Sequence, residues 1–309
     1  MAVLDDYQQV AAGYADWSGL DVDFVDAHLT GDVLVARLAD REVVVAMRER
    51  TPFPRSLLER LPALRMLVTT GMRNASIDRA AAAALGITVT GTSALRTPTS
   101  ELTWALIMGL IRPVGGYDAD VRAGRWQRTV GGDLAGRTLG LVGLGNQGRA
   151  VAAVGAAFGM RVVAWSPHLT AERAAAGGAT LVGREELFAT ADVVSLHMVL
   201  AAGTTGIVGE RELRAMRSES FLVNTSRALL IDQDALRRAV EQEWLAGVAL
   251  DVFDVEPIPA GHWLLTSPRT LLSPHMGYVS DANYRRCFAD VVENIAAYRA
   301  GEPIRRLDH

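Results

Sequence analysis

The chain has a single cysteine, Cys287, and it lacks both a long apolar run and a cluster of basic residues. One cysteine permits neither an internal disulfide nor a multi-cysteine metal site, which is typical of a reducing compartment. No window of about 18 uninterrupted apolar residues is present, so no membrane-spanning helix is expected. The formal net charge is −4, and no run is rich in Lys or Arg, which argues against nucleic-acid and anionic-membrane partners.

Signal and metal-binding patterns are missing as well. The N-terminal MAVLDDYQQV carries two acids where a secretory signal needs a basic region followed by an apolar one. The six histidines are scattered, without the short spacing that metal ligands need. We therefore expect a cytoplasmic protein that holds no metal ion.

Short hydrophobic runs are abundant. The 309 residues, 50% of them hydrophobic, exceed what one core usually organises, so two domains are expected. Runs rich in β-branched residues alternate with helix-like stretches, which indicates parallel sheets covered by helices. The strands expected in the first third span residues 2–4, 22–25, 43–46, 66–68 and 87–89.

The two series are separated by a long apolar helix expected over residues 98–111 and ended by Pro113 and the glycines after it. The strands expected in the second series span residues 139–143, 161–165, 193–196, 221–224, 247–250 and 270–272. A last amphipathic helix, over residues 281–299, is suited to return the chain to the first domain.

A dinucleotide-binding motif, GLGNQG, stands between the first strand of the second series and a helix-like stretch. In such a turn Gly143 allows the tight bend, Gly145 lets the backbone approach a pyrophosphate, and Gly148 allows close helix packing. The amides that begin the helix, at Asn146 and Gln147, are then available to the anion.

The residues near the expected ribose leave the choice of cofactor open. NAD-binding units usually carry an acid about 20 residues beyond the glycines, whereas this chain has Ser166, followed by Pro167 and His168. The missing carboxylate removes the usual barrier to a 2′-phosphate, but a strong NADP site would place an arginine there, and the nearest is Arg173. NAD and NADP both stay open, as does the simpler interpretation that Ser166 caps a turn.

Three further segments each follow an expected strand: VNTSRALLID, LDVFDVEP and LSPHMGY. They would bring Arg227, Glu256 and His275 to the carboxyl edge of the second sheet, where open α/β sheets bind ligands. A guanidinium can grip a carboxylate and polarise a carbonyl, while an imidazole gives or takes a hydroxyl proton. A neighbouring carboxylate favours the imidazolium and orients it. These types suit reversible hydride transfer at a carbon that bears oxygen.

Together, GLGNQG, VNTSRALLID, DVFDVEP and SPHMGY resemble the D-isomer-specific, NAD(P)-dependent 2-hydroxyacid dehydrogenase family over nearly the whole chain. The resemblance implies a 2-oxoacid reductase in which His275 is the acid/base, Glu256 its partner, and Arg227 the group that binds the substrate carboxylate and carbonyl. It also implies a homodimer joined through the nucleotide domains. The domains would be a Rossmann domain over residues 97–279 and a smaller, discontinuous, flavodoxin-like substrate domain over residues 1–96 plus 280–309.

The resemblance also suggests binding residues. It implies that the TTGMRN loop presents main-chain amides of Gly71 and Met72 to the substrate carboxylate. His197, Thr225 and Asp251 would lie at the cofactor, although a lone histidine such as His197 is more often a hydrogen-bonded core residue.

Besides the serine described above, two positions depart from the family pattern. Ala228 stands where the family usually has glycine, which adds a Cβ at a position that can need an unusual backbone conformation or the close approach of a ligand. Arg73 replaces a small or apolar residue. With Arg48 and Arg50 it predicts an unusually basic substrate site and a substrate with a second anionic or polar group; the alternative is that these arginines are solvated or pair with Glu49.

Other functions stay open at this point. Formate- or phosphite-type oxidation uses related scaffolds, and a nucleotide-sensing binding protein would keep the dinucleotide site without turnover. A methyltransferase would leave the second doubly wound domain and the histidine motif unexplained. A serine hydrolase is disfavoured because neither Ser226 nor Ser273 lies in a GxSxG elbow.

Overall fold

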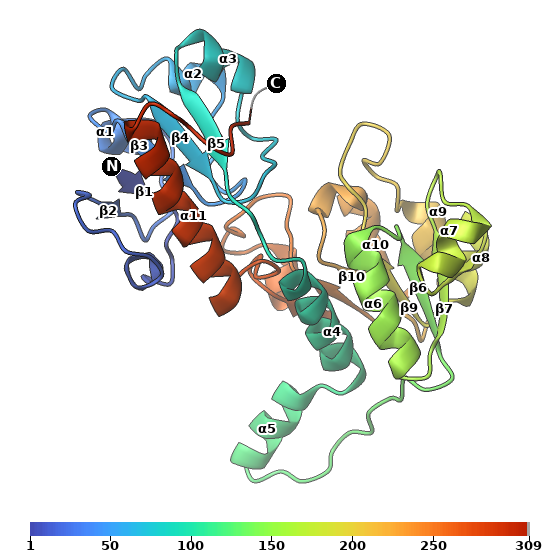
Figure 1. Ribbon diagram of the computed structural model, residues 1–309. Coiled ribbons are helices and arrows are strands. Elements are labelled where there is room, and N and C mark those ends of the chain that lie inside the picture. Colours follow the sequence, from blue (N-terminus) through green and yellow to red (C-terminus); the bar gives the residue numbers. More distant parts are fainter. Residues whose placement is uncertain (308–309) are drawn as a thin grey trace. The chain divides into compact units, whose positions relative to one another are not determined.

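The structure is a computed structural model that describes residues 1–307. The chain divides into two compact units (Figure 1): Met1–Leu95 together with the C-terminal segment from Val279, and Arg96–Tyr278. We call them unit 1 and unit 2. Each contains one parallel sheet with helices, so the expected α/β fold with two parallel sheets is confirmed.

Unit 1 has a five-stranded parallel sheet in the order β2-β1-β3-β4-β5, the flavodoxin-like order. The central strands are short and buried on both faces, as β-branched runs between helices require. Its strands are β1 (Ala2–Val3), β2 (Asp23–Phe24), β3 (Val43–Ala46), β4 (Met66–Thr69) and β5 (Thr88–Gly91), and its helices are α1 (Gly31–Leu38), α2 (Arg55–Leu58), α3 (Arg79–Ala84) and α11 (Asp281–Arg299), with a 3-10 turn at Ala11–Gly13.

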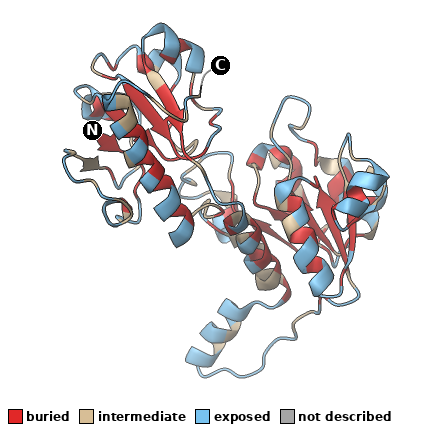
Figure 2. Cartoon of the chain, in the orientation of Figure 1, coloured by how far each residue is buried: buried red, intermediate tan, exposed pale blue. Residues whose placement is uncertain are grey.

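Helix α11 belongs to the core of unit 1, although it lies about 190 residues beyond β5 in the chain. Ser280 caps its N-terminus by accepting a hydrogen bond from the amide of Asn283. Its apolar side chains Phe288, Val291 and Ile295 are buried, and Figure 2 shows the buried face running along the helix. The returning helix expected from the sequence is therefore present.

Unit 2 has a seven-stranded parallel sheet in the order β12-β11-β10-β9-β6-β7-β8. The order reverses at β6, the switch point at which doubly wound sheets bind nucleotides. Its strands are β6 (Thr138–Val142), β7 (Arg161–Trp165), β8 (Thr180–Leu181), β9 (Val193–Leu196), β10 (Phe221–Asn224), β11 (Gly247–Leu250) and β12 (Thr270–Leu272). Its helices are α4 (Thr97–Ile111), α5 (Val114–Arg122), α6 (Asn146–Ala157), α7 (Ala171–Ala176), α8 (Arg184–Thr190), α9 (Glu210–Ala215) and α10 (Gln233–Glu241), with 3-10 turns at Ala228–Leu230 and Trp263–Thr266.

The strand register brings the site-bearing loops of unit 2 to a common edge. Six residues are aligned across neighbouring strands, and each is the last of its strand: Trp165, Val142, Leu196, Asn224, Leu250 and Leu272. In unit 1 the same holds for Ala46, Thr69 and Gly91. Each loop that carries a predicted site residue therefore starts from a fixed point on its sheet.

Helix α5 was not expected from the sequence, because Pro113 and the glycines were interpreted only as the end of α4. Pro113 instead serves as the N-cap of α5, where its missing amide hydrogen costs nothing. The helix has no buried residue, and Figure 2 shows it mostly exposed. Among the described residues, no helix has both the length and the apolar character needed to cross a membrane.

Candidate active site

The glycine turn after β6 is shaped by close backbone contacts. Gly143 has a φ of +99°, and a Cβ there would lie 2.5 Å from the carbonyl oxygen of His197. A Cβ on Gly148 would lie 2.3 Å from the carbonyl oxygen of Gly143. A Cβ on Gly145 would have nothing within 4 Å. The first and last glycines are thus required by the protein's own packing, whereas Gly145 leaves space for a ligand to approach the backbone.

The start of α6 can receive an anion. Gly145 is its N-cap and supplies no side-chain hydrogen bond, so the amides of Asn146, Gln147 and Gly148 lack a capping acceptor. The helix dipole adds partial positive charge at this end. The side-chain amide of Gln147 donates to the carbonyl oxygen of Arg96 over 2.9 Å, which anchors the first turn. This cradle fits the pyrophosphate of a dinucleotide.

The loop after β7 carries no acid at the ribose position. Ser166 is partly buried, and Pro167 and His168 are exposed. Arg173, on α7, donates from its guanidinium to the carbonyl oxygen of His168 over 3.0 Å. A guanidinium is therefore tied to this loop, where an acid would otherwise exclude a 2′-phosphate.

His197, which directly follows β9, has a neutral ring that contacts a side chain of that strand. Its Nε2 lies 2.9 Å from the hydroxyl of Ser195, which is fully buried. Burial lowers the pKa of His197 to about 4. Its carbonyl oxygen borders the glycine turn at Gly143, so this histidine constrains the turn through main-chain packing. Thr225 is also buried, and its hydroxyl pairs with that of Thr103 on α4 over 2.8 Å.

A histidine–carboxylate pair lies beyond β11 and β12. Nδ1 of His275 is 2.6 Å from Oε2 of Glu256, and the amide of Phe253 donates to Oε1 of the same carboxylate over 2.9 Å. The side chains of His275 and Glu256 are 17% and 27% exposed. Because Nδ1 donates to the carboxylate, Nε2 is the ring nitrogen left for proton exchange with a ligand. The structure thus brings two of the predicted residues together.

Asp251 holds the loop that carries this histidine. It is fully buried, and its two carboxylate oxygens accept from the amides of Met276 over 2.7 Å and Gly277 over 2.8 Å. Burial raises the pKa of Asp251, and hydrogen bonds from Ser273 and the two amides oppose that shift. His275 adopts a left-handed backbone conformation, φ +54°, which is unfavourable for a residue with a Cβ. Asp251 therefore acts on the histidine through the main chain.

Arg227 follows β10 in an extended conformation. Its NH1 donates to the carbonyl oxygen of Ser226 over 2.8 Å, and its own carbonyl oxygen accepts from Nδ2 of Asn224 over 2.9 Å. Ala228 begins a 3-10 turn and is not among the residues with positive φ. The expectation that its Cβ would meet an unusual backbone conformation is therefore wrong.

In unit 1, the TTGMRN loop is tied to β5. The amide of Gly71, which has a φ of +93°, donates to Oγ1 of Thr92 over 2.8 Å. Met72 is exposed, and in the described part of the chain its amide donates to no protein acceptor. Of the two amides expected to receive a carboxylate, Gly71 already has a partner and Met72 does not.

Arg48 lies directly against this loop. Its NH1 is 2.0 Å from the point that a Cβ on Gly71 would occupy, and it lies 3.4 Å from the carbonyl oxygen of Thr70. Arg48 has a left-handed backbone, φ +53°, held by donation from its amide to Thr70 Oγ1 and by Nδ2 of Asn74 on its carbonyl oxygen. Such strain at a charged residue is typical of functional sites.

The other two arginines expected here differ in their surroundings. Arg50 donates to the carbonyl oxygen of Asp5 over 3.0 Å, and its guanidinium lies 4.8 Å from the centre of the Tyr7 ring. Arg73 is exposed. Glu49 lies 3.8 Å from Nε of Arg48, so the pairing considered from the sequence does occur. Arg48 is thus the arginine most closely integrated with the loop.

Thr92 and Asp251 show what sequence patterns did not reveal. Thr92 follows a strand with no motif around it, and nothing in the sequence marks it as the partner of an amide 21 positions earlier. The sequence likewise did not indicate that the carboxylate oxygens of Asp251, a residue expected at the cofactor, bind the histidine loop. Within residues 1–307 no group of three or more His, Cys, Asp or Glu side chains is placed to hold a metal ion.

Known proteins resemble this chain over most of its length. A family model described as "D-isomer specific 2-hydroxyacid dehydrogenase, NAD binding domain" matches residues 104–277. A glyoxylate reductase of Korarchaeum cryptofilum is 35% identical over 87% of this chain and 83% of its own. A D-3-phosphoglycerate dehydrogenase of Bacillus subtilis is 33% identical over 84% of this chain and 50% of its own. A phosphoglycerate oxidoreductase from Vibrio cholerae superposes with a TM-score of 0.93, at 35% identity, over 97% of this chain and 98% of its own.

The glycine turn predicts two distinguishable defects. Gly148→Ala forces a Cβ against the Gly143 carbonyl, so we expect a melting temperature several degrees lower and at least tenfold weaker NADH binding. Gly145→Ala has room in the protein, so we expect an unchanged melting temperature with a similar loss of binding. Thermal melts without cofactor and NADH fluorescence titrations measure both. Tight binding by Gly145→Ala would show that no ligand approaches this backbone.

The low pKa of His197 predicts a pH-dependent stability. The folded protein keeps this ring neutral down to about pH 4, whereas an unfolded chain protonates it near 6.5. The stability from the neutral ring is therefore complete above pH 6.5 and is lost as the pH falls towards 4. We expect His197→Gln to show a shallower decline of melting temperature than wild type over this interval. Parallel declines would contradict the assignment.

Proposed function

The chain belongs to the D-isomer-specific 2-hydroxyacid dehydrogenase family, and we propose that it reduces a 2-oxoacid that carries a second anionic group. As a member, it is an NAD(P)-dependent oxidoreductase that transfers hydride reversibly between the cofactor and the carbonyl carbon of a 2-oxoacid. The observation that supports the proposed residue roles best is the short hydrogen bond between His275 and Glu256. The substrate's second group, the residue roles and the domain roles below are our proposals.

The cofactor is assigned to unit 2. The amides of Asn146, Gln147 and Gly148 would bind the pyrophosphate, and Gly145 leaves the approach open. Ser166 and the anchored Arg173 support acceptance of NADP as well as NAD, because no carboxylate opposes a 2′-phosphate there. When bound, the reduced nicotinamide supplies the hydride that the substrate's carbonyl carbon receives.

The protein's own groups supply the proton and orient the substrate. His275 donates a proton from Nε2 to the carbonyl oxygen as that oxygen gains charge, and the ring is left neutral. Glu256 holds Nδ1–H and stabilises the imidazolium before transfer. Arg227 binds the carboxylate and polarises the carbonyl through its guanidinium. In the reverse direction His275 takes the proton from the hydroxyl group.

We assign substrate binding to unit 1. The amide of Met72 is suited to receive the carboxylate, because Gly71 is already bound to Thr92. Arg48, fixed against the same loop, is suited to a second anionic group on the substrate. The chain contains no lysine, so apart from histidine its cationic side chains are all guanidinium groups, whose planar donors match carboxylate and phosphate oxygens.

We also propose a homodimer formed through unit 2. Helix α5 and the segment after it expose several large apolar side chains: Val114, Val121, Trp126 and Val130, which are 66%, 55%, 74% and 101% exposed. Next to them lies a surface hollow lined by Met108, Ile111, Leu134 and Phe158. Exposed apolar surface of this kind is typical of a subunit interface, and a second copy would cover it.

The first test is paired initial rates with NADH and NADPH over glyoxylate, pyruvate, hydroxypyruvate, phenylpyruvate and oxaloacetate. We expect His275→Ala to lower kcat by roughly 100-fold or more, and Glu256→Gln to lower it less, because general acid catalysis is worth about 10²–10⁴. His262→Ala is the matched control, since this histidine caps a 3-10 turn and packs against the neighbouring Trp263 ring. If the wild-type protein binds cofactor but reduces none of these acids, the proposal is wrong.

The second test concerns the second anionic group. We expect Arg48→Met to lower kcat/KM for oxaloacetate at least tenfold and for glyoxylate by less than threefold, because only the former presents a second carboxylate. Arg73→Ala, at an exposed arginine, should change neither by more than about threefold. An unchanged preference in Arg48→Met would refute the role of this guanidinium.

A further inference from the structure

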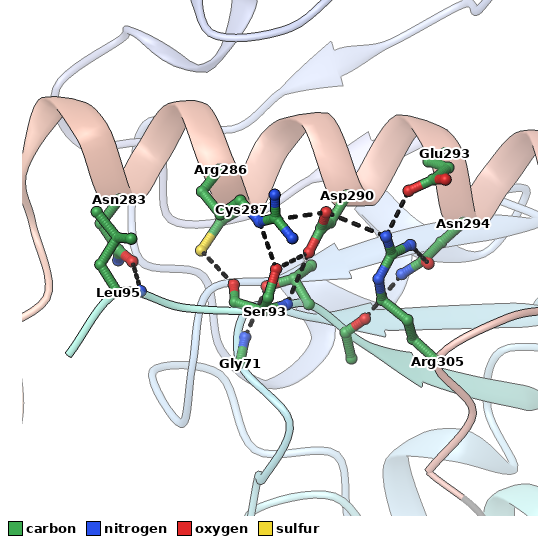
Figure 3. Close-up of polar contacts among 12 residues, drawn as sticks. Gly71, Ser93, Leu95, Asn283, Arg286, Cys287, Asp290, Glu293, Asn294 and Arg305 are labelled. Atoms are coloured by element: carbon green, nitrogen blue, oxygen red, sulfur yellow. Dashed lines mark hydrogen bonds and ion pairs between the residues drawn. The ribbon is translucent and has the colours of Figure 1, made fainter. Parts of the chain in front are cut away.

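Helix α11 carries a polar stripe on its buried side. Asn283, Cys287, Asp290 and Asn294 are spaced three or four residues apart, which places them on one face. Each is at most 4% exposed. Figure 3 shows these side chains directed at the segment that continues from β5, which we call the exit segment, residues 91–95. Burying a polar group costs free energy unless the group is hydrogen-bonded, so each of these side chains needs a hydrogen-bond partner.

The stripe binds the main chain of the exit segment. The amide of Ser93 donates to Oδ2 of Asp290 over 2.7 Å, and the Ser93 hydroxyl donates to the same oxygen. The amide of Leu95 donates to Oδ1 of Asn283 over 2.7 Å. Since β5 ends at Gly91, these side chains supply hydrogen bonds that a neighbouring strand would otherwise provide.

Further contacts hold the same segment at Gly91 and Ser93, including a hydrogen bond from Nε of Arg286 to the Ser93 hydroxyl over 2.7 Å. Nδ2 of Asn294 donates to the carbonyl oxygen of Gly91 over 2.8 Å, and the amide of Gly91 donates to the carbonyl oxygen of Arg305 over 2.9 Å. The thiol of Cys287 lies 3.4 Å from the carbonyl oxygen of Ser93. Main-chain groups on both sides of Thr92 are therefore held by side chains of α11 or by the chain after it.

The charge of Asp290 is compensated within the cluster. Arg305 NH2 lies 3.2 Å and Arg286 Nε 3.8 Å from Oδ1 of Asp290. Arg305 also donates to Oδ1 of Asn294 over 2.9 Å and pairs with Glu293. These partners offset the cost of burying the carboxylate. Glu293 contacts Arg305 from the exposed side and touches no part of the exit segment in the contacts described.

The exit segment in turn holds the TTGMRN loop. Thr92, fully buried, accepts from the amide of Gly71 through Oγ1 and donates from its own amide to the Gly71 carbonyl oxygen over 3.4 Å. A Cβ on Gly91 would lie 2.7 Å from that carbonyl oxygen and 3.0 Å from Sδ of Met72. The two segments are in direct contact, so a shift of Ser93 and Thr92 moves the loop.

We propose that Asp290 is a positioning residue for the reaction: by holding Ser93 it places Thr92, and Thr92 places the Gly71–Met72 loop that receives the substrate carboxylate. The proposal rests on the proposed function for the role of the loop. Asp290 lies on a different element and touches neither Gly71 nor Met72 in the contacts described. Its effect passes through two residues of main chain.

Steady-state kinetics tests the link. Asp290→Asn preserves size and removes the charge that binds Ser93, and we expect it to raise the KM for the 2-oxoacid about tenfold while kcat and the KM for NADH change less than threefold. Glu293→Gln removes the same charge from the same helix and should leave all three values within twofold. Thr92→Val should match Asp290→Asn, and Thr92→Ser, which keeps the hydroxyl, should restore the wild-type KM.

A double-mutant cycle tests the route. If Asp290 acts through Thr92, the KM of the double variant Asp290→Asn/Thr92→Val will exceed that of either single variant by less than threefold. Independent effects would instead multiply, so that the double variant's KM would exceed the wild-type KM by the product of the two single effects. Multiplying effects would show that Asp290 acts elsewhere and would overturn the proposal. A KM for the 2-oxoacid that shifts equally in Asp290→Asn and Glu293→Gln would overturn it too.

Hydrogen exchange separates this proposal from the proposed function. The amide of Gly71 is protected by Thr92, so we expect the peptide covering residues 69–74 to exchange at least fivefold faster in Asp290→Asn and Thr92→Val than in Glu293→Gln. Faster exchange in an enzyme that reduces no 2-oxoacid would support the structural link and refute the proposed function. Unchanged exchange in both variants would overturn the link, whatever the activity.

Discussion

A parallel sheet brings the carboxyl ends of all its strands to one edge, and the proposed chemistry of this chain depends on that constraint. In unit 2 the last residues of β6, β9, β10 and β11 are in register, and the segments after them supply the glycine turn, His197, Arg227 and Glu256. In unit 1 the loops with Arg48 and Gly71 follow β3 and β4 in the same way. Within each unit, residues far apart in the sequence therefore lie at the same edge of the sheet, because the strands before them are neighbours.

Sharing an edge does not orient a side chain, and orientation has a cost at two of these positions. His275 and Arg48 both have left-handed backbones, a conformation disfavoured by their Cβ atoms. Each is held by hydrogen bonds to main-chain atoms: Asp251 binds the two amides that follow His275, and Asn74 binds the carbonyl oxygen of Arg48. The strain persists because buried polar partners leave these loops no alternative arrangement of equal stability.

Features set by short-range patterns were predictable from the sequence, and features set by long-range contacts were not. The glycine turn lies within six residues, and strand β3 has the bounds expected from its apolar run. Helix α5 was missed because proline both ends one helix and begins another. The bond between Thr92 and Gly71 spans 21 positions, and that between Asp290 and Ser93 spans 197. No periodicity or motif encodes such pairings, and polar residues at helical spacing do not reveal what they bind.

The same kind of hydrogen-bonding contact occurs in both units. A buried Asn or Asp near the carboxyl end of a strand binds main-chain groups of a loop in four cases: Asp6, Asn74, Asn224 and Asp251. Asp290 does the same for the segment after β5, but from a helix. Loops lose the ladder hydrogen bonds that strands provide, and their main-chain groups must find other partners when they are buried. An amide or carboxylate side chain meets that need at a single geometry, because moving the loop leaves a buried donor or acceptor unsatisfied. The same side chains that satisfy the buried backbone groups of these loops therefore also position the residues to which we assign the chemistry.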